Sequence, residues 1–132
     1  MDNRKIREIK RVVKAIFRIP EVHSVLLFGS IVRGEESERS DIDICVVAPK
    51  ARDKERLANI IAGMVPRNYD VCVFELLPLF IKIDVINNHI ILYTRDKLEL
   101  YEYFYHYRKL WKDQEYRQRL TTEELRQIFG HK

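Results

Sequence analysis

Two aspartates, Asp41 and Asp43, stand two positions apart at the start of an apolar run that we expect to form a strand. Alternate side chains of a strand point to the same face of a sheet, so the two carboxylates would lie side by side. Neighbouring carboxylates repel each other unless a cation relieves the repulsion. Pairs of hard divalent cations held by carboxylates are a common device for phosphoryl transfer. The spacing therefore predicts a metal site with that chemistry.

A third carboxylate would complete such a site, and Asp70 is the candidate. It stands near the start of another expected strand and shares a strand face with Cys72. Glu75 falls on the opposite face and is the weaker candidate. A carboxylate at Asp70 could complete the coordination of one metal ion and accept a proton from an attacking hydroxyl.

Gly29 and Ser30 stand at the junction between a short apolar strand and an expected helix over residues 30–36. A helix N-terminus binds phosphate because it offers free N–H groups and a partial positive charge. Gly29 would let a phosphate approach the backbone, and the Ser30 hydroxyl could cap the helix or donate to a phosphate oxygen. Arg33 could reach the same phosphates with its fork of donors. The sequence thus predicts a phosphate site near the metal site.

A second interpretation needs no function: Gly29 and Ser30 form a plain turn, and the aspartates are solvated at the end of a strand. A lone Asp-x-Asp would not exclude this. Here, however, Gly-Ser is followed ten residues later by Asp-x-Asp, and both motifs adjoin apolar strands. That combination is rare by chance in a chain of this length, so we favour the functional interpretation.

The elements that would position these residues follow from the spacing of apolar residues and from Gly and Pro breaks. We expect strands over residues 25–28, 41–47, 69–74 and 89–93. We expect helices over residues 4–17, 30–36, 53–65, 76–86 and 96–118, and a last helix at about 121–129. Thr121 and Glu124 match a capping box, which suggests that the last helix begins separately. The order predicts an α+β fold with a small mixed β-sheet, flanking helices and a long C-terminal helix.

The composition is that of a globular protein. The chain has 132 residues, of which 46% are hydrophobic, and we expect a single domain over residues 1–132 with a core at about 22–95 and C-terminal helices at about 96–129. We expect no membrane span, no signal peptide and a cytoplasmic location. The net charge of +4 suits a nucleoside triphosphate but equally an ordinary basic surface, so we do not expect direct nucleic-acid binding. The two cysteines are too few for a disulfide framework and are expected to be buried thiols.

The C-terminal helix is unusually aromatic over residues 100–107. At helical spacing, Leu100, Phe104, Tyr107 and Trp111 share one face, which we expect to be core. Tyr101 and Tyr105 lie beside that face. The sequence leaves open whether these tyrosines pack within the chain or cover a partner protein.

Taken together, the motifs resemble the DNA polymerase beta-like nucleotidyltransferase superfamily and, within it, the minimal nucleotidyltransferases (MNT) of prokaryotes. The matching segments read LLFGS, DIDICVV and YDVCVFE and fall within about residues 22–95. The resemblance implies a nucleotidyltransferase fold with two Mg²⁺ ions held by Asp41, Asp43 and Asp70, and ATP as the substrate. These three aspartates would be the catalytic residues.

The resemblance also implies that Gly29, Ser30 and Arg33 bind the nucleotide. Many relatives read Gly-Ser-Arg-x-Arg-Gly after the first strand. This chain keeps Arg33 and Gly34 but has Ile31 in place of the first arginine. The departure bears on phosphate binding or on the choice of acceptor and leaves the three aspartates untouched.

MNT proteins are similar to antitoxins that pair with HEPN-domain ribonuclease toxins and adenylylate a toxin tyrosine. The resemblance therefore implies transfer of AMP from ATP to a tyrosine of a HEPN-type partner, with this chain as the antitoxin. One alternative is a nucleotidyltransferase that modifies the hydroxyl of a small molecule. Another is a non-catalytic binding module that inhibits a HEPN partner by occlusion, against which the three intact aspartates argue.

Overall fold

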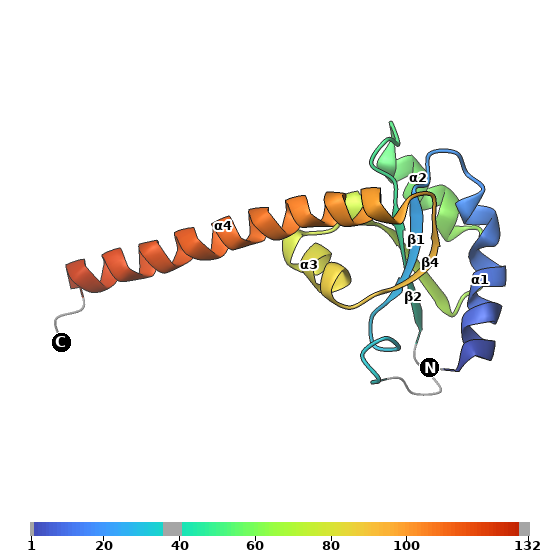
Figure 1. Ribbon diagram of the computed structural model, residues 1–132, viewed down its shortest axis with the longest axis horizontal. Coiled ribbons are helices and arrows are strands. Elements are labelled where there is room, and N and C mark those ends of the chain that lie inside the picture. Colours follow the sequence, from blue (N-terminus) through green and yellow to red (C-terminus); the bar gives the residue numbers. More distant parts are fainter. Residues whose placement is uncertain (1, 36–40, 130–132) are drawn as a thin grey trace.

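The structure is a computed structural model that describes residues 2–35 and 41–129, with side chains as far as residue 116. Its four strands and most of its helices lie where the sequence predicts them (Figure 1). In chain order they are α1 (Asn3–Phe17), β1 (Ser24–Phe28), β2 (Ile42–Val47), α2 (Lys54–Ala62), β3 (Tyr69–Val73), the 3₁₀ turn η1 (Phe74–Leu76), α3 (Leu79–Asn87), β4 (Ile90–Thr94) and α4 (Lys97–Phe129).

The strands form one mixed sheet in the order β3-β2-β1-β4. β1 is antiparallel to both β2 and β4, whereas β2 and β3 are parallel because the chain crosses between them through α2. The end of β1, the start of β2 and the start of β3 therefore meet at one end of the sheet. The α+β class and the mixed sheet are as predicted.

Each face of the sheet has its own apolar core. Ile42, Ile44 and Val46 of β2 pack on one face with residues of α1 and α2. Cys45 and Val47 point to the other face, where residues of α3 and α4 cover them. In Figure 1 the sheet accordingly lies between α1 on one side and α3 with the first turns of α4 on the other. By the same alternation, Asp43 belongs to the face of Cys45, as the sequence predicts.

The two cysteines face each other across β2 and β3 in the strand register. Both are free thiols; Cys45 is buried and Cys72 is half-buried. Burial, with the neighbouring Cys72 thiol, raises the pKa of the Cys45 thiol well above its ordinary value. Cys45 therefore stays protonated and behaves as a small core residue.

The predicted helix at residues 30–36 is wrong over the described residues 30–35, of which 30–34 form a turn; residue 36 lies outside the described part. The N–H of Arg33 donates to the carbonyl of Gly29 (3.2 Å), and the N–H of Glu35 donates to the carbonyl of Ser30 (2.9 Å). Gly34 has a φ of 76°. A glycine in this left-handed conformation ends a helix, and here it does so after a single turn.

Three other helix predictions need correction. α2 ends at Ala62, not at residue 65, and Gly63 is its C-cap. α3 begins at Leu79, not at residue 76, because Pro78 stands at its N-cap and the preceding residues form η1. α4 runs without a break to Phe129, so Thr121 starts no separate helix. No Gly or Pro interrupts residues 96–129, and a capping-box pattern alone does not end a helix that is already formed. Among the described residues no helix is long and apolar enough to cross a membrane.

Candidate active site

The three predicted aspartates gather at the end of the sheet where β1 stops and β2 and β3 begin. Asp43 is half-buried in the second position of β2. Its register partners are Phe28 on β1 and Asp70 on β3. Asp41 stands just before β2, and both it and Asp70 are exposed. The pairing of β2 with β3 thus brings Asp70 beside Asp43, which precedes it by 27 positions in the chain.

The charges at this end of the sheet act on one another. The pKa of Asp43 is raised above its ordinary value, chiefly by burial and further by the negative charges of Asp70 and Asp41. The positive charge of Arg33 opposes this rise. Three carboxylates held this close are costly without a positive counter-charge.

The donor set fits a hard divalent cation, because such cations prefer carboxylate oxygens. In the part of the chain that the structure describes, however, no three His, Cys, Asp or Glu side chains form a ready-made metal cage. The two exposed aspartates have freedom to adjust their side chains, whereas Asp43 is fixed in the sheet. A metal ion would therefore be held by Asp43 with Asp41 and Asp70 completing its ligands.

Gly29 is fixed by its contact with Asp43. Its φ is 82°, in the left-handed region. A Cβ built on Gly29 would overlap the Asp43 carboxylate and lie 2.9 Å from its Cγ. The sequence predicts only that Gly29 lets a phosphate approach the backbone. The structure gives two further reasons for glycine at this position, which are the left-handed φ and the Asp43 carboxylate. No sequence signal links Gly29 to Asp43, because the contact depends on the register of β1 and β2.

The turn at residues 29–34 is anchored in the core. Ile31 is buried among the residues under α1 and α2, so the residue that departs from the family pattern serves packing. Ser30 is half-buried at the start of the turn. Because the turn is not a helix, it carries little helix dipole. Phosphate binding here would depend on the individual N–H groups, the Ser30 hydroxyl and Arg33.

Arg33 is held by a carboxylate that the sequence analysis did not identify. Its Nη1 donates to Oδ2 of Asp84 on α3 at 2.9 Å, and its Nε lies 3.5 Å from Oε2 of Glu35. Asp84 is the one acidic residue in the sequence of α3, LFIKIDVIN. A single acid in a largely apolar helix is the signal that could have singled it out.

Glu75, the weaker candidate for the third carboxylate, lies at the opposite end of the sheet. Its carboxylate accepts the N–H of Ala48 at 3.0 Å and the hydroxyl of Tyr103 at 2.8 Å. Burial and the neighbours Tyr107 and Glu75 raise the pKa of Tyr103, so its hydroxyl keeps its proton. Glu75 therefore fastens α4 to the sheet and takes no part in the aspartate cluster.

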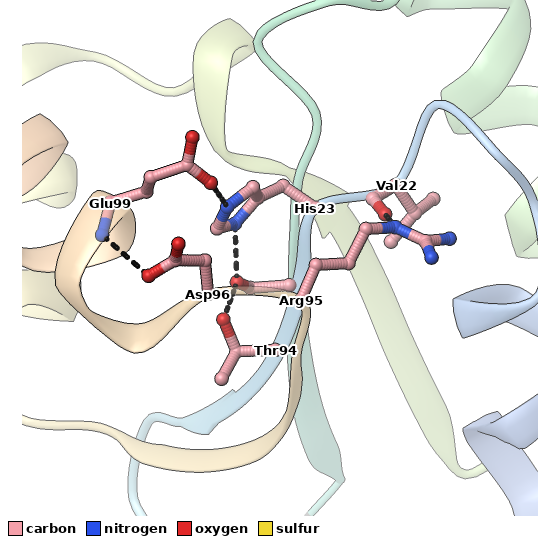
Figure 2. Close-up of polar contacts among 7 residues, drawn as sticks. Val22, His23, Thr94, Arg95, Asp96 and Glu99 are labelled. Carbon is pink, nitrogen blue, oxygen red and sulfur yellow. Dashed lines mark hydrogen bonds and ion pairs between the residues drawn. The ribbon is translucent and has the colours of Figure 1, made fainter.

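A second polar cluster at that opposite end resembles a Ser-His-acid arrangement (Figure 2). His23 Nδ1 lies 2.8 Å from Ser24 Oγ, and His23 Nε2 lies 3.2 Å from Glu99 Oε2. Ser24 is fully buried, and its hydroxyl donates to Thr94 Oγ1 at 2.8 Å. A buried hydroxyl that already donates to a neighbour is not presented as a nucleophile. The cluster instead ties the start of β1 to the end of β4 and the start of α4.

Two surface pockets also lie away from the aspartates. One, of about 420 Å³, is lined by residues such as Val22, His23 and Glu99. The other, of about 640 Å³, lies beside the start of α2 and is lined by residues such as Arg52 and Arg56. Neither includes any of the six predicted site residues. The candidate active site is therefore placed by its charges and strand register, not by cavity size.

The chain matches the family model described as polymerase beta, nucleotidyltransferase, over residues 8–98. It therefore belongs to this nucleotidyltransferase family. A relative from Methanocaldococcus jannaschii named "Putative protein adenylyltransferase" is 43% identical over 97 residues, which is 74% of this chain and 75% of the relative. The match to the family model spans the four strands and the three aspartates.

Several solved structures with a similar fold come from toxin–antitoxin pairs. One is a toxin–antitoxin with AMP-PNP, at a TM-score of 0.67 and 18% identity, covering 91% of this chain and 97% of the other. A second contains a tri-AMPylated HEPN toxin of Shewanella oneidensis in complex with its MNT antitoxin, at a TM-score of 0.62 and 16% identity, covering 95% and 98%. At these identities the similarity shows the fold.

Proposed function

We propose that this protein transfers AMP from ATP to a tyrosine hydroxyl of a HEPN-type partner protein and acts as the antitoxin of that partner. The observation that carries the proposal is the cluster of Asp41, Asp43 and Asp70 beside the turn that holds Gly29 and Arg33. Carboxylates suit divalent metal ions, and an arginine beside them suits the phosphates of a metal-bound triphosphate.

The choice of a protein acceptor is supported by the relatives. The Methanocaldococcus jannaschii relative is named for protein adenylylation, and a structure of similar fold contains an AMPylated HEPN toxin. α4 adds support, because it extends well beyond the sheet (Figure 1). It exposes several large side chains, which are Leu98, Tyr101, Tyr105, Leu110 and Tyr116. A projecting helix with exposed aromatic residues suits a protein partner.

In the proposed reaction, Asp41, Asp43 and Asp70 would hold two Mg²⁺ ions, which would supply positive charge to offset the charge of the triphosphate and of the leaving pyrophosphate. Asp70 is exposed and accepts the proton of the attacking tyrosine hydroxyl. The hydroxyl oxygen forms a bond to the α-phosphorus, the bond to the β-phosphate oxygen breaks, and pyrophosphate leaves. Ser30 and Arg33 bind the phosphates, so that the acceptor and the α-phosphorus are held in line.

The acceptor is identified by incubating the protein with Mg²⁺, ATP and the product of the adjacent gene, and by mapping AMP on that product by mass spectrometry. We expect AMP on a tyrosine with wild-type protein and none with Asp41→Asn. Magnesium-dependent ATP binding without a modified protein would favour a small-molecule acceptor. No ATP binding at all would favour the non-catalytic binding module.

A further inference from the structure

Arg33 is held from both of its ends. Its backbone belongs to the turn at residues 29–34, which Ile31 anchors in the core. Its guanidinium reaches across to α3, where Nη1 donates to Asp84 Oδ2 at 2.9 Å. The two residues are 51 positions apart in the chain, so the contact joins the turn after β1 to the distant helix α3. The side chain of Arg33 is 37% exposed, which leaves room for a ligand.

Asp84 is itself well supported. Its second carboxylate oxygen, Oδ1, accepts the side-chain N–H of Asn88 at 3.2 Å. Its neighbours in α3 are buried against the sheet: Ile83, Val85 and Ile86. Both oxygens of Asp84 therefore have a defined donor, and its backbone belongs to a packed helix. A carboxylate fixed in this way can orient an arginine.

The contact leaves donors of Arg33 for a ligand. A guanidinium carries five N–H donors in a fixed plane. Asp84 takes one at Nη1, and Glu35 pairs with Nε. The remaining N–H groups lie in the plane of the same guanidinium, so holding Nη1 also restricts the directions in which they point. Arg33 also stands in the same turn as Gly29, whose backbone lies directly against the Asp43 carboxylate, so the turn that carries the guanidinium adjoins the aspartate cluster.

We propose that Asp84 is a positioning residue of the nucleotide site, which holds the Arg33 guanidinium in the orientation that binds the triphosphate. This inference rests on the proposed function. An exposed ion pair adds little to stability, so stabilisation alone explains the contact poorly. A negative charge near a triphosphate site also opposes binding by Coulomb repulsion. Asp84 helps ATP binding only if its effect on the orientation of Arg33 outweighs that repulsion. The proposal therefore predicts that removing the Asp84 charge weakens ATP binding, whereas repulsion alone predicts tighter binding.

The test is a double-mutant cycle on ATP affinity in the presence of Mg²⁺, measured by calorimetry. Asp84→Asn keeps the shape of the side chain and removes its charge. We expect it to weaken ATP binding about tenfold in the wild-type background and to have no such effect in Arg33→Ala. In steady-state transfer, the KM for ATP rises while kcat stays close to that of the wild type. Glu102→Gln, which removes one exposed negative charge on α4, is the matched control and leaves ATP affinity unchanged.

Asn88→Ala is a second variant that leaves Asp84 in place and removes its support. It should weaken ATP binding in the same direction, by less, and only when Arg33 is present. Tighter or unchanged binding in Asp84→Asn would overturn the proposal, because repulsion would then be the larger effect. An equal loss with and without Arg33 would also overturn it, since Asp84 would then act through the fold. If the wild type binds and transfers nothing from ATP, the proposed function fails and this inference fails with it.

Discussion

At the scale of single residues, Asp43 and Gly29 form the tightest point of the candidate site. Asp43 is half-buried beside the two other aspartates, and Gly29 has no space for a side chain against it. The alternation of side chains along the strand was enough to predict the sheet face on which Asp43 lies. The contact with Gly29 was not predictable, because it depends on how β1 and β2 are paired.

Asp43→Asn removes the charge of this carboxylate and so tests whether that charge destabilises the folded protein. The pKa of Asp43 is higher in the folded protein than in the unfolded chain, so the ionised carboxylate lowers the free energy of unfolding at neutral pH. This loss of stability disappears as the pH falls below the ordinary pKa of an aspartate, because Asp43 is then protonated in both states. In a chelator, we expect the variant to unfold at a higher temperature than the wild type at pH 7, with the difference shrinking as the pH falls toward 4. Thermal unfolding over a pH series measures this. A variant that unfolds at a lower temperature at pH 7 would contradict the raised pKa.

The glycines of the chain provide a graded test of the site. Gly29→Ala meets both a left-handed φ and the Asp43 carboxylate, whereas Gly34→Ala meets a φ of 76° in open space. Gly63→Ala has neither problem, since its nearest new contact is an ordinary 3.6 Å. We expect losses in the free energy of unfolding of roughly 2–4 kcal/mol for Gly29→Ala, about 1 kcal/mol for Gly34→Ala and close to none for Gly63→Ala. Denaturant unfolding gives all three values, and equal losses at Gly29 and Gly34 would show that the Asp43 contact is unimportant.

At the scale of elements, the sheet and most helices followed from the sequence, and the exceptions have local causes. Apolar alternation and Pro breaks located the strands to within a residue at most ends. The helix expected after Gly29 was wrong because Gly34 closes the turn, and helical spacing of Ile31 and Arg33 fits one turn as well as several. The break expected before Thr121 was wrong because a capping motif can also occur inside a helix. Asp84 was missed because its partner lies 51 positions away.

The attachment of α4 to the sheet depends on the contact between Tyr103 and Glu75. Tyr103→Phe removes a 2.8 Å hydrogen bond to a partly buried carboxylate, and we expect a loss of about 1–2 kcal/mol in the free energy of unfolding. Tyr105→Phe is the matched control, because the Tyr105 side chain is 68% exposed on the same helix, and we expect no loss. Denaturant unfolding compares the two variants. Equal stability of both would mean that the aromatic packing of α4, not this hydrogen bond, holds the helix in place.

At the scale of the whole molecule, the two ends of the sheet have separate roles. One end gathers the aspartates and the turn that holds Arg33. The other end fastens α4 through Glu75 and through the cluster of His23 and Ser24 (Figure 2). α4 projects away from the sheet, and we propose that a partner lies along it (Figure 1). The sequence predicted the core face of α4 and left its exposed face undecided, since helical spacing does not reveal how far a helix extends beyond its domain.

Nucleotidyl transfer is tested by following the label of ATP in the presence of Mg²⁺ and the product of the adjacent gene. ATP labelled at the α-phosphate is compared with ATP labelled at the γ-phosphate, for the wild type and for Asp43→Asn. We expect wild-type protein to transfer only the α-label, and Asp43→Asn to reduce this transfer by roughly a hundredfold or more because a metal ligand is lost. Transfer of the γ-label, or α-label transfer by Asp43→Asn at the wild-type rate, would contradict nucleotidyl transfer by the three aspartates.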